Sequence, residues 1–277
     1  MTPRTRFAPS PTGLLHLGHA FSAIIGHDRA AAAGGVFLVR IEDLDGARCR
    51  PAFEAALLED LRWLGLGWED PVMRQSERAA AYGAALGRLA EAGLLYPCGC
   101  TRRAVAAALS APQEGAETPR AYPGTCRHRP MADRRQGDSL RLNMSRALES
   151  VGSLPPFTET GPLFGGIHSP DPEALVREGD IVLARRDAGT AYHLAVVVDD
   201  AAQGVTEVVR GADLFGSTPI QILIQRLLGL PTPAYHHHRL VRDDAGRRLA
   251  KRDDARAIRR YREDGASPAD IRAMLGL

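Results

Sequence analysis

The feature that most constrains the fold is the continuous apolar segment VFLVRI at residues 36–41. A strand buried on both faces of a parallel sheet has this pattern, because neither of its faces meets water. A predicted strand at 5–9 and a predicted helix at about 15–34 precede it, and a further predicted helix covers 51–65. Pro51 suits the first turn of that last helix. Strand, helix, strand and helix in this order indicate the opening of a Rossmann-like α/β sheet.

The composition is that of an ordinary globular chain. Its 277 residues are 44% hydrophobic and 25% charged, enough for one large domain or one domain with an insertion. No run approaches the roughly 18 apolar residues of a membrane helix, and the N-terminus lacks a signal-peptide core, so we expect a cytoplasmic protein. The net charge of +2 does not mark the whole surface as a nucleic-acid binder, although an arginine-rich stretch at 126–136 could form a local basic patch.

The pattern of predicted elements changes after Pro97, where a segment rich in Pro, Gly and charged residues begins. We interpret this segment as an insertion that divides the α/β domain. Strand-like apolar runs return in DIVLARR, AYHLAVVVDD and GVTEVVRG, and a helix is predicted over 212–230. The expected divisions are a first half at 1–97, the insertion at 98–185, a second half at 186–239, and a loop with short helices at 240–277.

The cysteines cluster in a way that indicates a metal site. The chain has four of them: Cys49, Cys98, Cys100 and Cys126. In a cytosolic protein the last three suggest structural zinc, which thiolates bind strongly and which takes four protein ligands. His128 is chemically the commoner fourth ligand, whereas Tyr122 would have to lose its phenolic proton to the metal. The residue types alone leave both open. We interpret Cys49 as an ordinary small side chain and the HHH segment at 236–238 as a strand rather than a metal site.

The segment RFAPSPTGLLHLGHA at 6–20 is a candidate nucleotide site. A Pro/Gly turn delivers the chain to the start of a predicted helix, where free N–H groups and the helix dipole attract anions. His16 and His19 share one face of its first turn, and Gly18 between them leaves room for a flat ligand. These features suit a nucleoside triphosphate.

The same segment resembles the signature of class I glutamyl-tRNA synthetases, whose HIGH motif is similar to HLGH. RLAKR at 248–252 lies where that family has its KMSKS loop. The resemblance extends through RIEDLD, CGC with its later Cys, AYHLAVVVDD and VVRGADL, and so covers nearly the whole chain. It implies a class I aminoacyl-tRNA synthetase catalytic core, with a zinc-containing insertion that contacts tRNA. It also implies one structural Zn²⁺ per chain, with Tyr122 as the fourth ligand.

The resemblance further implies a site that activates L-glutamate. Arg6 and Arg210 would bind the side-chain carboxylate, since a guanidinium can hold a carboxylate through two hydrogen bonds. Glu42 would bind the ammonium group. The other residues implied to line the glutamate pocket are Phe7, Ala8, Pro9, Ser10 and Tyr192. The residues implied to bind ATP, which brings Mg²⁺, are His16, Gly18, His19 and Lys251. Of these, His16, His19 and Lys251 are the implied catalytic residues.

Lys251 is the one lysine in a chain whose 35 basic residues are otherwise arginine. In the implied mechanism its ammonium group neutralises the charge that develops as pyrophosphate leaves ATP. Arginine is a planar fork of different reach, so it is a poor substitute for such a contact. The loop departs from the family pattern at Arg248, which replaces a lysine, and at Ala250, which replaces a serine whose hydroxyl could contact ATP.

Synthetases of this family continue beyond the KMSKS loop into an anticodon-binding domain, but this chain ends at Leu277, shortly after Lys251. The remaining residues suffice for two short helices. We therefore expect the activity of the branch that lacks this domain. It activates glutamate with ATP and transfers it to the queuosine base in the anticodon of tRNA(Asp). We expect a monomer.

Three alternatives remain open. A compact glutamyl-tRNA synthetase would charge a tRNA 3′ end. An adenylate-forming enzyme of another class would load a carrier protein or a small molecule without depending on tRNA. A non-enzymatic RNA-binding relic would fit the altered RLAKR loop, but ATP–pyrophosphate exchange would exclude it.

Overall fold

The protein is described by a computed structural model that covers residues 2–101, 103–105, 122–186, 189–242 and 256–277. The strands are β1 Arg4–Phe7, β2 Val36–Ile41, β3 Glu69–Arg74, β4 Leu95–Cys98, β5 Ser139–Leu142, β6 Phe157–Glu159, β7 Gly166–His168, β8 Val182–Arg185, β9 Gly189–Thr190, β10 Glu207–Gly211 and β11 Ala234–His238. The helices are α1 Leu17–Ala32, α2 Pro51–Trp63, α3 Ala79–Glu91, α5 Met144–Val151, α6 Pro172–Glu178, α7 Tyr192–Ala202, α8 Thr218–Leu228, α9 Ile258–Glu263 and α10 Pro268–Leu275. Three short 3₁₀ helices are η1 Gln75–Arg78, η2 Met131–Asp133 and η3 Ala212–Ser217. None of the described helices is long and apolar enough to cross a membrane.

The predicted α/β opening is confirmed. Strands β1, β2 and β3 form a parallel sheet, and α1 and α2 are the helices that connect them. Strands β10, β11 and β6 form a second parallel group, to which β7 adds an antiparallel edge. The two groups adjoin at β1 and β10, where the Thr206 N–H donates to the Arg4 backbone oxygen at 3.0 Å. The carboxyl ends of β1 and β10 therefore lie together, the place where parallel α/β sheets bind ligands.

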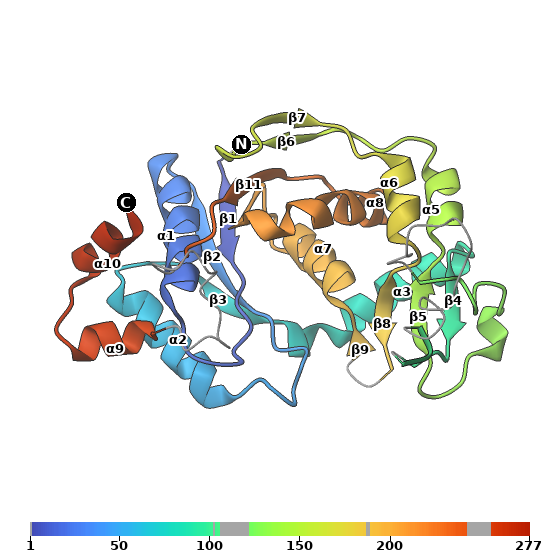
Figure 1. Ribbon diagram of the computed structural model, residues 1–277, viewed down its shortest axis with the longest axis horizontal. Coiled ribbons are helices and arrows are strands. Elements are labelled where there is room, and N and C mark those ends of the chain that lie inside the picture. Colours follow the sequence, from blue (N-terminus) through green and yellow to red (C-terminus); the bar gives the residue numbers. More distant parts are fainter. Residues whose placement is uncertain (1, 102, 106–121, 187–188, 243–255) are drawn as a thin grey trace.

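A separate antiparallel sheet, in the order β4-β5-β8-β9, lies toward the right of the view in Figure 1. Helices α5 and α6 accompany it, and its apolar side chains share a core with α3, α7 and α8. The segment 98–185 does not stay in this sheet throughout, because β6 runs back to pair with β11 and β7 pairs with β6. The proposed domain limits therefore stay a prediction.

The sequence prediction was wrong for AYHLAVVVDD, which forms helix α7 rather than a strand. Its run Leu194–Val197 is buried and packs in the core that it shares with α3 and α8. A continuous apolar run suits a helix buried on all sides as well as a buried strand, so periodicity could not separate the two. The helix predicted over 212–230 is present, but begins as η3 before α8. The HHH segment lies in a strand, β11, as predicted.

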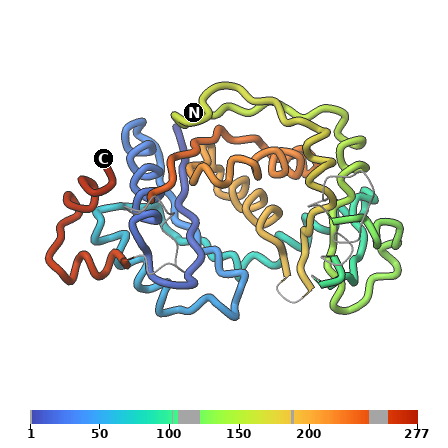
Figure 2. Tube along the Cα trace, in the orientation of Figure 1, coloured from blue at the N-terminus to red at the C-terminus, as the bar shows by residue number. Residues whose placement is uncertain are grey.

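The two short helices predicted at the end of the chain are present as α9 and α10, and they return to the start of the molecule. Figure 2 shows this end beside the N-terminal helix. The Ile258 N–H donates to the Leu15 backbone oxygen at 2.8 Å, and Arg272 forms an ion pair with Asp28 of α1 at 2.6 Å. The C-terminal segment therefore holds the turn before α1 and the helix itself in place.

Candidate active site

A cavity of about 580 Å³ opens at the carboxyl ends of β1 and β10, beside the start of α1. It brings together nearly all of the residues predicted for the amino-acid and nucleotide sites. These are Arg6, Phe7, Ala8, Pro9, Ser10, His16, Gly18, His19, Glu42, Tyr192 and Arg210. Residues 238–241, the last residue of β11 and the three that follow it toward the predicted lysine loop, also line the cavity. Lys251, Arg248 and Ala250 lie outside the described residues, so their roles stay predictions.

His16 and His19 define the start of α1. His16 is the N-cap, and its Nδ1 accepts from the Gly18 N–H at 3.1 Å. His19 reaches back, so that its Nδ1 accepts from the His16 N–H at 3.3 Å. Because both Nδ1 atoms accept, each neutral ring carries its proton on Nε2 and can donate from there. A Cβ on Gly18 would lie 3.0 Å from Cε1 of His16, so a larger residue would crowd the ring.

Arg6 has a carboxylate partner within the protein. Its Nε donates to Oδ1 of Asp200 at 3.0 Å, and Arg40 donates to the same oxygen at 2.6 Å. Burial alone would raise the pKa of Asp200, but the two guanidinium groups hold that pKa below its usual value. Arg40 and Asp200 were not predicted from the sequence as part of this site. Their signal was a charged residue inside or directly after an apolar run, where burial requires a partner.

Arg210 differs because its partners are neutral. Its guanidinium donates to Nε2 of His237 at 3.0 Å, to Oε1 of Gln221 at 2.7 Å and to Oγ1 of Thr218 at 2.8 Å. Within the described part of the chain it forms no ion pair with a carboxylate. Burial lowers the pKa of Arg210, although the group stays charged at neutral pH. A buried cation without a counterion is an unfavourable arrangement that an anionic ligand would relieve.

Glu42 provides the opposite charge in the same cavity. It follows β2, and its N–H donates to the Pro9 backbone oxygen at 3.0 Å, which ties it to the turn after β1. Burial raises the pKa of Glu42, and Arg40 and Arg6 oppose that shift. Burial also raises the pKa of Tyr192 at the start of α7, so its phenol is neutral. A carboxylate and a guanidinium in one cavity suit a ligand that carries both charges, such as an amino acid.

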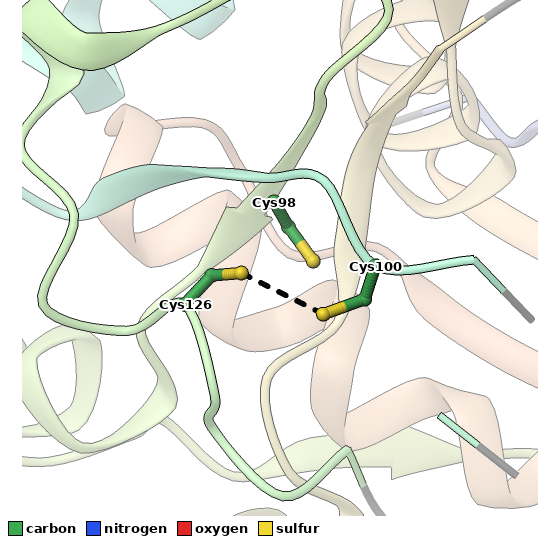
Figure 3. A group of neighbouring side chains, drawn as sticks. All are labelled: Cys98, Cys100 and Cys126. Carbon is green, nitrogen blue, oxygen red and sulfur yellow. Dashed lines mark hydrogen bonds between the residues drawn. The ribbon is translucent and has the colours of Figure 1, made fainter. Parts of the chain in front are cut away.

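The three clustered cysteines converge as predicted (Figure 3). The sulfur atoms of Cys98, Cys100 and Cys126 lie within 4.8 Å of one another, and the last two are 3.6 Å apart. Oη of Tyr122 lies 3.4 Å from Sγ of Cys98 and 3.6 Å from Sγ of Cys100. In a zinc tetrahedron the S···S edges are about 3.8 Å and the S···O edges about 3.5 Å. The four donor atoms therefore fit a zinc ion.

The two candidates for the fourth ligand separate in the structure. His128 is not among the described residues that converge on the cysteine sulfurs, and it lines a different cavity with Arg127 and Arg129. Tyr122 is buried at the cluster, and the Cζ of Arg141 lies 3.7 Å from the centroid of its ring. The attraction of this guanidinium to the ring face holds the phenol at the cluster.

Comparison with known proteins is consistent with this geometry. Residues 3–277 match the family described as tRNA synthetases class I (E and Q), catalytic domain. A curated relative from Rhodobacter capsulatus, named glutamyl-Q tRNA(Asp) synthetase, is 59% identical over 99% of this chain and 99% of its own. Relatives of the same name from Geobacter sulfurreducens and Nocardia farcinica are each 46% identical. They cover 91% and 98% of this chain, and 76% and 82% of their own.

Solved structures of related enzymes resemble this chain in fold. A glutamate tRNA ligase from Elizabethkingia meningosepticum, in complex with its amino acid, gives a TM-score of 0.72 at 26% identity, over 96% of this chain and 54% of that one. The glutamate-tRNA synthetase of Elizabethkingia anophelis gives 0.73 at 25% identity, with the same coverage. The chain spans about half the length of these two structures. With the family match over residues 3–277, it belongs to the class I tRNA synthetases for glutamate and glutamine, as a catalytic domain of that family.

Proposed function

We propose that the protein activates L-glutamate with ATP and then transfers the glutamyl group to the queuosine base in the anticodon of tRNA(Asp). The observation that carries the glutamate assignment is Arg210, a buried guanidinium held by neutral partners in the main cavity. The side-chain carboxylate of glutamate would supply the counterion that Arg210 lacks. The neutral side-chain amide of glutamine would not. The names of the relatives from three bacterial genera support the choice of acceptor.

In the first step an oxygen of the glutamate α-carboxylate attacks the α-phosphate of ATP in line. A carboxyl–phosphate bond forms, and the bond to pyrophosphate breaks. This reaction depends on positioning and charge stabilisation, so it needs no side-chain nucleophile. Glu42 holds the substrate ammonium group, while Nε2–H of His16 and of His19 supply donors at the anion-binding start of α1. Lys251 and Mg²⁺, which accompanies ATP, neutralise the charge on the phosphates.

In the second step a hydroxyl of the queuosine cyclopentenediol attacks the adenylate carbonyl, an ester forms, and AMP leaves. A second cavity of about 280 Å³ offers a route for this acceptor. It shares Ser10, Glu42 and Tyr192 with the main cavity and adds polar side chains, among them Asp45 and Thr190. An acceptor in it would lie next to the group that holds the substrate ammonium, and therefore near the activated carbonyl.

We also propose one structural zinc ion per chain, with Cys98, Cys100, Tyr122 and Cys126 as ligands. Zinc would join the end of β4 to the loop around Cys126 and would take no part in either step. The enzyme is proposed to act as a monomer. Since the proposed acceptor is a tRNA, the enzyme is also proposed to act in the cytoplasm.

The solved relatives favour a second candidate, because both are glutamate tRNA ligases or synthetases. Radiolabelled glutamate, ATP and purified protein distinguish the two. The proposal expects label on queuosine-containing tRNA(Asp), no label on tRNA that lacks queuosine, and no loss of label when the 3′ end is removed. Label at the 3′ end of tRNA(Glu) would instead identify a compact charging enzyme. Glutamate activation with no transfer of label to any tRNA would point to a carrier-loading enzyme.

A further inference from the structure

A chain of buried polar groups stands behind Arg210. In the sheet, Arg210 of β10 pairs directly with His237 of β11, and β11 pairs in turn with β6, which ends in Glu159. Three neighbouring strands therefore carry an arginine, a histidine and a glutamate side by side. The His237 and Glu159 side chains are fully buried.

Backbone groups fix the position of Glu159. Its Oε1 accepts from the N–H of His237 at 2.9 Å and from the N–H of Gly161 at 2.7 Å. A Cβ on Gly161 would lie 2.6 Å from Oε1, so this approach requires glycine. Oε1 is thus satisfied by two main-chain donors, which leaves Oε2 to contact His237 Nδ1 at 2.5 Å.

These contacts determine where the imidazole proton lies. A carboxylate only accepts hydrogen bonds, so Nδ1 of His237 must carry a proton to bond with Oε2. Nε2 of a neutral imidazole is then an acceptor, and it receives the Arg210 Nε–H at 3.0 Å. Burial lowers the pKa of His237 and Arg210 adds to that effect, against the pull of Glu159, so the ring is neutral at physiological pH.

We propose that Glu159 and His237 are positioning residues that hold Arg210 through a neutral acceptor and so keep its positive charge available for the substrate carboxylate. The inference rests on the proposed activation of glutamate. A carboxylate in direct contact, as Asp200 is with Arg6, would orient a guanidinium equally well but would neutralise it. A histidine whose tautomer is set by a remote glutamate orients Arg210 without placing an anion against it. The pair would therefore contribute to the preference for glutamate over glutamine.

Glu159→Gln tests the arrangement with little change in shape. The amide oxygen can still accept the two backbone N–H groups, which places the amide NH₂ against Nδ1 of His237. The imidazole must then accept at Nδ1 and carry its proton on Nε2, where it meets the Nε–H of Arg210. Two donors face each other, so Arg210 loses this bond. Loss of a hydrogen bond to a charged group predicts a rise in the KM for glutamate of about tenfold to a hundredfold, with a smaller change in kcat.

Glu207→Gln is the matched control. Glu207 is a partly buried carboxylate on β10 that bonds Arg29 and Thr160, not the Arg210 chain. It would lose an ion pair and some stability but keep the wild-type KM for glutamate in ATP–pyrophosphate exchange. The proposal expects the KM ratio of glutamine to glutamate to fall in Glu159→Gln alone. Equal KM values in the two variants would overturn the positioning role.

A second measurement does not depend on activity. Proton-coupled ¹⁵N spectra of histidine-labelled protein, assigned with His237→Asn, report which ring nitrogen of His237 carries hydrogen. We expect Nδ1–H in the wild type and Nε2–H in Glu159→Gln. An Nε2–H or fully protonated ring in the wild type would overturn the inference. If the wild type shows Nδ1–H but does not activate glutamate, the proposed function fails while the hydrogen-bonded chain itself stands.

Discussion

Both the main cavity and the cysteine cluster contain buried polar groups, but these groups obtain their partners in different ways. Around the cavity the protein supplies partners from its own strands and helices, such as Asp200 for Arg6 and His237 for Arg210. At the cluster three thiols and a phenol converge within contact distance of one another. Donor groups of one kind gathered in this way need a cation to hold them as anions. The cavity is therefore organised by the chain alone, whereas we propose that the cluster depends on zinc.

The largest effect is expected from Arg210→Ala, which removes the uncompensated charge of the cavity. Loss of one partner of a buried charged contact costs about 3–5 kcal/mol, so kcat/KM for glutamate should fall about two hundredfold or more. ATP–pyrophosphate exchange measures this. Arg226→Ala, at an exposed site near the end of α8, is the control and should leave the rate unchanged. If both variants keep the wild-type glutamate dependence, Arg210 does not bind substrate.

The next effect concerns the cluster. We expect about one zinc per chain by elemental analysis. Cys126→Ser should lose most of the zinc and lower the unfolding temperature, because a structural site needs all of its ligands. Cys49→Ser is the matched control, since Cys49 lies outside the cluster and should keep both the metal and the stability. Zinc retained in Cys126→Ser would show that the ion binds elsewhere.

A smaller effect separates the two candidates for the fourth ligand. Tyr122→Phe keeps the ring beneath Arg141 but loses the oxygen, so we expect zinc affinity to fall by at least tenfold, the loss typical of disturbing a ligand's surroundings. Competition with a chromophoric chelator measures the affinity. His128→Ala should bind zinc as tightly as the wild type. The reverse order of the two variants would assign the site to His128.

The smallest expected effect is the contribution of a buried carboxylate, Asp60, to the pH dependence of stability. Asp60 of α2 is buried like Asp200, but among the described residues its closest ion-pair partner is the Arg262 guanidinium, 4.0 Å away. Burial raises the pKa of Asp60 to about 6. The folded state therefore prefers the proton, and stability falls as the pH rises from about 4 through 6. Asp60→Asn should raise the unfolding temperature by a few degrees at pH 8 and have no effect below about pH 4. A less stable variant at pH 8 would mean that the Arg262 contact outweighs desolvation.

The sequence predicts best what is local. The turn and helix start at 6–20 place His16, Gly18 and His19 together, and the strand ends bring Arg6 and Glu42 to the same edge. Contacts between distant parts of the chain could not be predicted, because Asp200 meets Arg6, and Glu159 meets His237, only through the order of the strands. The helix α7 was missed because it is buried on all sides. Tyr122 and His128 flank Cys126 closely, so only the path of the loop distinguishes them.

We propose above all that the main cavity selects an amino acid with an acidic side chain. ATP–pyrophosphate exchange by the wild-type protein, measured with glutamate, with glutamine and without amino acid, tests it most directly. We expect exchange with glutamate, and at least about a hundredfold lower kcat/KM with glutamine, because the side chain of glutamine brings no charge to Arg210. Equal exchange with both amino acids, or exchange with neither, would contradict it.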